Sequence, residues 1–220
     1  MKEKTYVEDV DRNMYDFRNE EKDAYRIRSG LTEDIVEKIS EEKHDPEWMH
    51  DFRLNSLKIY HEMKVPDWGP SIEGLNMDNI ATYVRANTKM KGNWSEVPEE
   101  IKDTFEKLGI PQAERTSLAG VGAQYDSELV YHNVRKEVEE QGVIYTDMES
   151  ALTGKYADMV KDHFMKLVTP HDHKFAALHG AVWSGGSFVY VPKGVSVEIP
   201  LQSYFRLNGA GAGQFEHTLI

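Results

Sequence analysis

The sequence predicts an α+β protein in which a mainly helical N-terminal region is followed by short β-strands. Up to residue 170, apolar side chains recur every three or four positions, as on one face of a helix. From Ser187 onward they alternate with a period of two, in runs separated by glycine and proline. We therefore divide the chain into a polar N-terminal arm at 1–30, a mainly helical domain at 31–170, and the start of a β-structured core at 171–220.

Composition and charge exclude several classes of function. The formal net charge of the 220 residues is −12, so a non-specific grip on phosphate backbones is not expected, and nucleic acid is a poor partner. The N-terminus lacks the apolar stretch of a signal peptide, and no segment approaches the roughly 18 apolar residues of a membrane span. We expect a cytoplasmic protein without membrane contact. There is no cysteine, which excludes disulfides, thiolate zinc sites and cysteine-held clusters within these residues.

The N-terminal elements are predicted from polarity and helix signals. Residues 1–30 are polar without a sustained period, which favours an arm that orders only against a partner or another domain. Residues 32–43 are expected to form a short helix. A second helix of about four turns should follow, because Asp45 is a good N-cap and Pro46 suits the first helical position. Residues 65–70 should end it, since they contain two prolines and a glycine.

The middle of the chain is expected to consist of loops, helices and one short strand. Residues 71–92 are irregular, with at most one short helix around 78–85, and residues 143–145 are a strand candidate. The remaining segments have apolar residues at helical spacing and end at a glycine or a proline. These expected helices are residues 97–109, which end at Gly109 with Pro111 beyond, residues 127–141, a helix capped by Thr146 or Asp147 that stops near Gly154, and residues 156–170.

The C-terminal part is expected to contain strands joined by tight corners, after one or two helical turns at 175–183. Gly185 and Gly186 are interpreted as such a corner, because no Lys-Ser/Thr pair follows them as in a phosphate loop. A sandwich, a barrel and a β-helix all fit this pattern, and only the β-helix requires successive rungs to stack. The expected strands are residues 188–191, 195–199, 201–207 and 215–220.

The segment FAALHGAVWSGGSFVYVPKGVSVEIPLQSYFRLN, followed by GQFEHTLI, closely resembles the SufB/SufD family of iron–sulfur cluster assembly scaffolds. The upstream segments GVGAQYDSELVYHNV and GVIYTDMESAL are similar to the same family. The resemblance covers residues 45–220 and implies a helical N-terminal region, a right-handed parallel β-helix core and a C-terminal helical segment. By this resemblance, residues 171–220 are the first rungs of the β-helix. We therefore expect a truncated core, with a complete protein of this length as the alternative.

The resemblance implies a scaffold for iron–sulfur cluster assembly rather than an enzyme, with a SufC-like ATPase and a SufD-like subunit as partners. Cysteines further along the family's chain handle the cluster, so the cluster is implied for the full-length member and no cofactor is expected in this segment. Arg206 and Asn208 resemble family residues that line a sulfur-transfer path inside the β-helix. A guanidinium there stays charged and can hold an anionic persulfide. The structural alternative is that Arg206 faces solvent or bonds a carbonyl at a corner.

A second interpretation of function is a cysteine-free module that keeps the family's shape and only pairs with a full-length relative. We identify no catalytic residue from spacing. His171 and His173 flank Asp172 and could present two imidazoles and a carboxylate to zinc, copper or nickel. Histidines in a loop after a proline are usually exposed, so we expect no metal site and retain His171 and His173 as the only candidate ligands. His179 and His217 are further histidines near this region, and His217 fits a surface position as well as a ligand.

Overall fold

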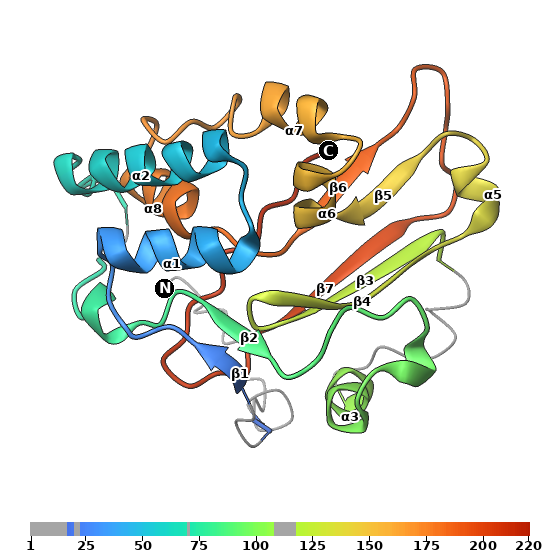
Figure 1. The fold of residues 1–220 in the computed structure, drawn as a ribbon, viewed down its shortest axis with the longest axis horizontal. Helices are drawn as coiled ribbons and strands as arrows, with labels where there is room; N and C mark the ends of the chain where they lie inside the picture. The colour runs from blue at the N-terminus through green and yellow to red at the C-terminus, as the bar shows by residue number, and fades with distance from the viewer. Residues whose placement is uncertain (1–16, 20–22, 70, 108–117) are drawn as a thin grey trace, which may run out of the picture.

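The structure is a computed structural model that describes residues 17–19, 23–69, 71–107 and 118–220. Its longest helices gather on one side and its larger sheets on the other (Figure 1). Helices α1 (Glu33–Lys43), α2 (Glu47–Glu62) and α8 (Lys174–Val182) pack against one another. The helices that the structure describes are all too short or too polar to cross a lipid bilayer.

The helical core forms because apolar faces from distant parts of the chain meet. Ile35, Val36 and Ile39 of α1 are fully buried against Ala181 and Val182 of α8. Helix α1 confirms the helix predicted at 32–43, and α8 confirms the helical turns predicted at 175–183. One core thus contains residues from both ends of the chain.

Helix α2 confirms the second predicted helix, but the expected cap is wrong. The N-cap residue is Pro46, which makes no side-chain cap hydrogen bond. The Asp45 carboxylate instead accepts a hydrogen bond from Nε of Arg53 at 2.6 Å, and both side chains are fully buried. Arg53 also donates to the Trp183 carbonyl at 2.9 Å, and its guanidinium lies 4.8 Å from the Trp183 ring centroid. A buried cation requires a carboxylate more strongly than a helix start requires a cap, which explains the difference.

Part of the predicted N-terminal arm belongs to the fold. Strand β1 (Asp23–Arg26) pairs antiparallel with β2 (Val84–Ala86), so the chain itself orders this segment. Ile27, directly after β1, is buried in the helical core. Residues 23–27 thus order against β2, which lies in the region predicted as the helical domain, and this agrees with an arm that orders only against a partner or another domain. Residues 1–16 and 20–22 lie outside the described part.

The segment between α2 and α3 is irregular with short elements, in agreement with the expected loop with at most one short helix around 78–85, although β2 was not predicted. A turn of 3-10 helix, η2 (Met77–Asn79), is followed by β2. A second such turn, η3 (Trp94–Glu96), precedes α3 (Glu99–Lys107). Helix α3 confirms the helix predicted at 97–109, although its expected end at Gly109 and Pro111 lies outside the described residues.

The helix predicted at 127–141 is wrong. Strands β3 (Gly120–Tyr125) and β4 (Glu128–Val134) form an antiparallel hairpin, and only α5 (Lys136–Glu139) is helical. Asp126 makes the turn in the left-handed conformation, with φ 54°. The apolar spacing in 129–134 fits a helix, but the same β-branched and aromatic residues also suit a strand. Pairing with β3 decides between the two.

The remaining strands pair across long stretches of sequence. Strand β7 (Leu201–Arg206) lies parallel to β3, from Gly120 opposite Leu201 to Tyr125 opposite Arg206, which gives the sheet order β4-β3-β7. Strand β6 (Ser187–Tyr190) pairs antiparallel with β5 (Ile144–Asp147). These strands confirm the predictions at 143–145, 188–191 and 201–207. Both pairings join segments on either side of residue 170.

Two predicted strands and part of one predicted helix are corrected. Residues 195–199 form no strand, and within the described chain no backbone hydrogen bond joins residues 196–199 to another segment. Residues 215–220 contribute an isolated parallel bridge between Leu219 and Phe188. Helix α7 (Ala157–His163) stops well before Pro170, and Val168, on the predicted apolar face, is 62% exposed. A strand requires hydrogen bonds to a neighbouring strand. Apolar residues at helical spacing do not by themselves extend a helix.

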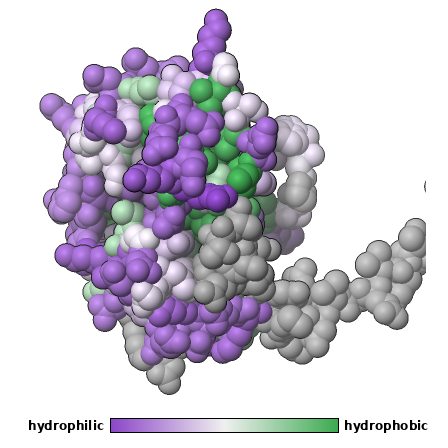
Figure 2. Space-filling view, turned by 90° about the vertical axis from the view of Figure 1, so that its right-hand side faces the viewer, coloured by the Kyte–Doolittle hydropathy of each residue, from purple (hydrophilic) through white to green (hydrophobic). Residues whose placement is uncertain are grey.

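Figure 2 views the side of the molecule that carries α5 and residues 191–200. Apolar side chains reach the surface there between charged ones. Val138, Val197 and Ile199 are among the residues that line a pocket of about 370 Å³ on this side. The unpaired segment 196–199 therefore borders an apolar surface.

Helix α6 (Met148–Thr153) confirms the predicted cap and end. Its N-cap is Asp147, whose Oδ1 accepts the N–H of Ser150 at 2.7 Å, and the helix stops before Gly154. Strand β5 therefore leads directly into α6, without an intervening loop. This places the first turn of α6 beside the start of β6.

Gly122 of β3 offers a test of this packing. A Cβ at Gly122 would lie 2.8 Å from the Tyr145 hydroxyl, which is held by Ser203 at 2.7 Å and by the Gln202 carbonyl at 2.9 Å. We expect Gly122→Ala to lower the free energy of unfolding by about 1–3 kcal/mol in urea titrations, because the tyrosine cannot move aside. Gly92→Ala is the control, since its Cβ would enter open space. Equal stability of the two variants would contradict the close packing of β3 on Tyr145.

Candidate functional site

The corner at the end of β7 holds Asn208, one of the two residues selected by the resemblance. The backbone N–H groups of Asn208 and Gly209 donate to Oδ1 of Asp126 at 2.6 and 2.9 Å. The Asp126 N–H in turn donates to the carbonyl of Arg206 at 2.8 Å. A single carboxylate in the β3–β4 turn thus fastens the turn that follows β7.

The Arg206 side chain is partly buried at the same corner. Its guanidinium lies 4.9 Å from the ring centroid of Phe17 and donates to the Phe17 carbonyl. The Asn208 side-chain oxygen accepts the N–H of Asn19 at 2.9 Å. The structure therefore brings Arg206 and Asn208 together against the 17–19 segment. Contact with a carbonyl is what the structural interpretation of Arg206 requires, and the sulfur-transfer role stays a prediction.

His171 and His173, the candidate metal ligands, have separate surroundings. Nδ1 of His173 accepts the N–H of Phe175 at 3.0 Å and so caps α8. The carboxylate of Asp172 accepts both the N–H and the hydroxyl of Thr169, at 2.6 and 2.8 Å, and these bonds lower the pKa of Asp172. Among the residues that the structure describes, no group of three or more His, Asp and Glu side chains is placed to hold a metal ion.

A pair of histidines is joined across the fold in a way that sequence reasoning missed. Nε2 of His179, on α8, lies 2.8 Å from Nδ1 of His217. The ring of His217 also lies 4.3 Å from that of Phe164. Burial, reinforced by the charge of Arg53, lowers the pKa of His179 to about 4, and burial together with His179 lowers that of His217 to about 3. Both rings are therefore neutral at pH 7, and one donates its proton to the other.

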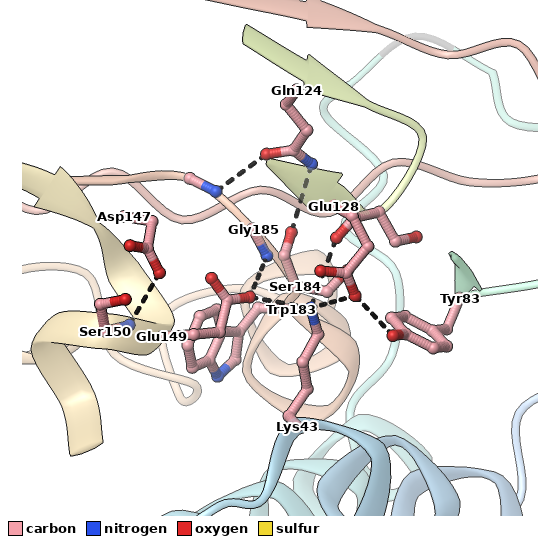
Figure 3. Close-up of polar contacts among 12 residues, drawn as sticks. Lys43, Tyr83, Gln124, Glu128, Asp147, Glu149, Ser150, Trp183, Ser184 and Gly185 are labelled. Atoms are coloured by element: carbon pink, nitrogen blue, oxygen red, sulfur yellow. Dashed lines mark hydrogen bonds and ion pairs between the residues drawn. The ribbon is translucent and has the colours of Figure 1, made fainter. Parts of the chain in front are cut away.

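Lys43 is the centre of a buried charge cluster that sequence reasoning also missed (Figure 3). It projects from the end of α1, and its side chain is 4% exposed. Its Nζ lies 2.7 Å from Oε1 of Glu128 on β4 and 2.9 Å from Oε1 of Glu149 on α6. The Tyr83 hydroxyl donates to Glu128 at 2.5 Å, and the N–H of Gly185 donates to Glu149 at 2.6 Å. The cluster thus joins two helices, a strand and the corner after α8.

The pKa shifts in this cluster follow from the balance of burial and charge. Burial alone would lower the pKa of Lys43, but the carboxylates of Glu149 and Glu128 outweigh it and raise the pKa. Burial would raise the pKa of Glu149, but Lys43 and the Gly185 N–H lower it. Burial and the charge of Glu128 raise the pKa of Tyr83. Lys43 and Glu149 are therefore charged at pH 7, and Tyr83 is protonated. Groups held in this way fix the arrangement of the elements around them rather than exchange protons.

The corner after α8 requires glycine at two successive positions. Gly185 and Gly186 have φ angles of 74° and 99°, and a Cβ at Gly186 would lie 2.0 Å from the His217 carbonyl oxygen. The N–H of Gly186 donates to Oε1 of Gln124 at 2.9 Å, and Nε2 of Gln124 donates to the Asp126 carbonyl at 2.9 Å. The corner interpretation of these glycines is confirmed. Gln124 connects this corner to the Asp126 turn and hence to the residues that follow β7.

Removing the Lys43 charge tests the cluster. We expect Lys43→Met to lower the free energy of unfolding by about 3–5 kcal/mol, because it leaves two poorly solvated carboxylates without their cation. The matched control is Lys38→Met, which removes an exposed pair with Asp34 at 3.1 Å and should leave stability nearly unchanged. Adding Glu128→Gln and Glu149→Gln to Lys43→Met should restore part of the loss. A Lys43→Met protein as stable as the Lys38→Met protein would contradict the cluster's role.

The histidine pair predicts a dependence of stability on pH. The folded-state pKa values of His179 and His217 lie below the ordinary histidine value of 6.5, so the unfolded chain binds more protons below that pH. Stability should therefore be lost as pH falls from 6.5 towards 4, by about 3 kcal/mol for His179 alone. Urea unfolding at successive pH values measures this. Replacing both histidines by glutamine should flatten the profile in this range, whereas His171→Gln should leave it unchanged. An identical profile in the double variant would show that other groups cause the acid loss.

Comparison with known proteins finds a matching family and several similar proteins. The family described as SufBD protein N-terminal region matches residues 33–203. The iron–sulfur cluster assembly protein SufB of Bacillus subtilis (strain 168) is 51% identical over 212 residues, which are 96% of this chain and 45% of that protein. An iron–sulfur cluster assembly SufBD family protein of Staphylococcus haemolyticus (strain JCSC1435) is 52% identical with the same coverage, as is one from Staphylococcus aureus (strain USA300).

The chain spans a little under half the length of these relatives. The family match includes the Lys43 cluster and the glycine corner and ends shortly before Arg206 and Asn208. The match covers most of the chain and agrees with the resemblance seen in its sequence motifs. This chain belongs to the SufBD family.

Proposed function

We propose that the chain acts in iron–sulfur cluster assembly as the N-terminal part of a SufB-type scaffold without enzymatic activity of its own. The observation that carries the proposal is its 51% identity to the Bacillus subtilis SufB over 96% of its length. Its partners are then a SufC-like ATPase and a SufD-like subunit, and its compartment is the cytoplasm. The lack of a helix fit to span a membrane among the described residues is consistent with that compartment.

The strands after α8 begin a right-handed parallel β-helix in this proposal. Two observations support it. Strand β7 lies parallel to β3, and Leu219 forms a parallel bridge with Phe188 of β6. Parallel contacts between successive passes of the chain are the pattern of a solenoid. The unpaired segment 196–199 is then a place where a further rung can add to the stack.

The iron–sulfur cluster is the cargo of such a scaffold. The 220 residues of this chain contribute to its assembly without ligating it through thiolates. Iron–sulfur clusters are held chiefly by cysteine thiolates, and the 220 residues contain no cysteine. The family resemblance implies that the cysteines that handle the cluster lie outside these 220 residues. Arg206 and Asn208 would contribute by holding anionic sulfur in transit, because the guanidinium is partly buried and permanently charged.

A second candidate is a module that pairs with a full-length relative and never takes part in sulfur handling. The absence of cysteine from the chain favours it. The two candidates differ in what Arg206 does, since only the scaffold requires its charge.

A chimera distinguishes the two. This chain replaces the matching 45% of the Bacillus subtilis SufB, and cluster assembly is measured as iron and sulfide transferred to an apo-acceptor protein. We expect the chimera to support assembly and Arg206→Ala to lower the yield severalfold, because the anion loses its fixed charge. Arg135→Ala is the control, since Arg135 is a surface arginine with a 39% exposed side chain.

A folded chimera without assembly activity contradicts the scaffold proposal. In that case, stable association of the separate 220-residue chain with the full-length relative would support the pairing module. Normal yield in the Arg206→Ala chimera would assign Arg206 to the structural contact with Phe17. Circular dichroism and urea unfolding establish that each variant is folded.

A further inference from the structure

An apolar groove lies on the helical side of the fold, between residues 75–80, α8 and residues 213–216. It has a volume of about 400 Å³. Leu75 and Met77 line one wall, Phe175 lies on α8, and Phe215 lines the other wall. Leu75 is 48% exposed, and Ile72, three residues earlier in the sequence, is 37% exposed. A concave apolar surface of this kind on a soluble protein is typical of an interaction site.

The groove is preformed, because its walls are fastened to the core. The N–H of Ser184 donates to the Phe215 carbonyl at 2.9 Å, and the N–H of Gly213 donates to the Ala81 carbonyl at 2.9 Å. Met77, Phe175 and Phe215 pack against the buried cluster of α1 and α8. The edge of the groove at Leu75 is exposed to solvent. A ligand that enters the groove would therefore meet a rigid floor, and little ordering entropy would oppose binding.

The carboxylate among the described residues that line the groove is Glu216. Asp78 lies in the segment 75–80 that forms one wall, and Glu73 precedes that segment in the sequence. No lysine or arginine occurs among the described residues that line it. Lys174, which precedes Phe175 on α8, donates instead to the carbonyls of Tyr60 and Met63, at 2.8 and 2.7 Å. An acidic rim around an apolar groove complements a basic, amphipathic ligand and repels an anionic one.

We infer that this groove is the docking site for a segment of a partner protein that inserts apolar side chains between Leu75 and Phe215 and places lysine or arginine beside Glu73, Asp78 and Glu216. A helix-in-groove contact is the matching mode, since it presents apolar anchors on one face and charges on the flanks. An anionic lipid membrane is another apolar ligand that such a groove could contact, and the acidic rim disfavours binding to it. This inference goes beyond the assembly proposal and does not depend on it.

The test uses the 220-residue chain and two synthetic helical peptides. Both peptides carry leucines along one face; one has lysines on both flanks of that stripe, and the other has glutamates. Binding is followed by fluorescence anisotropy of the labelled peptide. We expect the lysine peptide to bind and the glutamate peptide not to bind. Leu75→Asp, and separately Glu73→Lys with Glu216→Lys, should each weaken the lysine peptide about tenfold or more, as anchor and rim losses do.

Matched controls separate the groove from the acidic surface in general. Leu167→Asp changes a 98% exposed leucine outside the groove. Glu139→Lys with Glu140→Lys changes two acidic residues at α5. Both variants should bind the lysine peptide as the unchanged chain does. Leu75 is half exposed, so Leu75→Asp should stay folded, and unchanged amide protection in α8 confirms this.

Three results would overturn the inference. The first is no binding of the lysine peptide. The second is equal weakening by the control variants, which would show non-specific attraction to a chain of net charge −12. The third is binding of the chain to vesicles of anionic phospholipid that Leu75→Asp abolishes, which would assign the groove to a membrane surface.

Discussion

The ammonium group of Lys43 is the constraint on which the rest of the structure depends. It lies where α1, β4, α6 and the corner after α8 meet, and each of these contributes a partner or a supporting bond (Figure 3). A buried ion pair adds little net stability, because desolvation offsets most of the attraction. It does select one arrangement, since any shift of α1 relative to the sheet separates charges in a place that water reaches poorly. Lys43 is in the last turn of α1 and Glu149 in the first turn of α6, where the helix dipoles favour these signs.

A second buried cation acts on the same corner from the other side. Arg53 is neutralised by Asp45 and donates to the carbonyl of Trp183, two residues before the N–H that Glu149 receives. The chain from α8 to β6 is therefore held by α2 and α6 at once. Gln124 extends this arrangement to the Asp126 turn, which fastens Asn208 and Gly209. The corner that holds Arg206 thus inherits its position from charges in the helical half, through Gln124 and Asp126.

The sequence predicts the elements whose signals are local. Helices α1, α2, α6 and α8 follow from apolar spacing and from residues such as Pro46 and Asp147, and the glycine corner follows from two successive glycines. The helix predicted at 127–141 is wrong because it contains strand β4, and the spacing of Leu129, Val130 and Val134 is ambiguous until β3 is known to be the neighbour. The prediction that Asp45 caps α2 is wrong for a similar reason, because its partner Arg53 becomes buried only when Trp183 packs on it.

The candidate site was only partly predictable. Arg206 and Asn208 came from the resemblance of a motif, whereas their partners Asp126, Phe17 and Asn19 are distant in the sequence. Lys43, Glu128 and Glu149 carry no local signal, since charged residues on helices are usually solvated. His179 and His217 are single histidines until the fold places their nitrogens 2.8 Å apart. Charge pairing over long sequence separations is a property of the folded chain, and periodicity does not reveal it.

The parallel pairing of β3 with β7 has a consequence for the order of events during biosynthesis. Gly120 leaves the ribosome long before Leu201, its partner across the ladder, has been translated. The hairpin of β3 and β4 must therefore wait with one hydrogen-bonding edge open, while α8, which completes the helical core, is also still to come. Such an open edge attracts other nascent strands, and closing a long loop is slow. Capture of β7 closes this edge, so the interval before β7 is translated is the stage at which the emerging polypeptide is most exposed to aggregation.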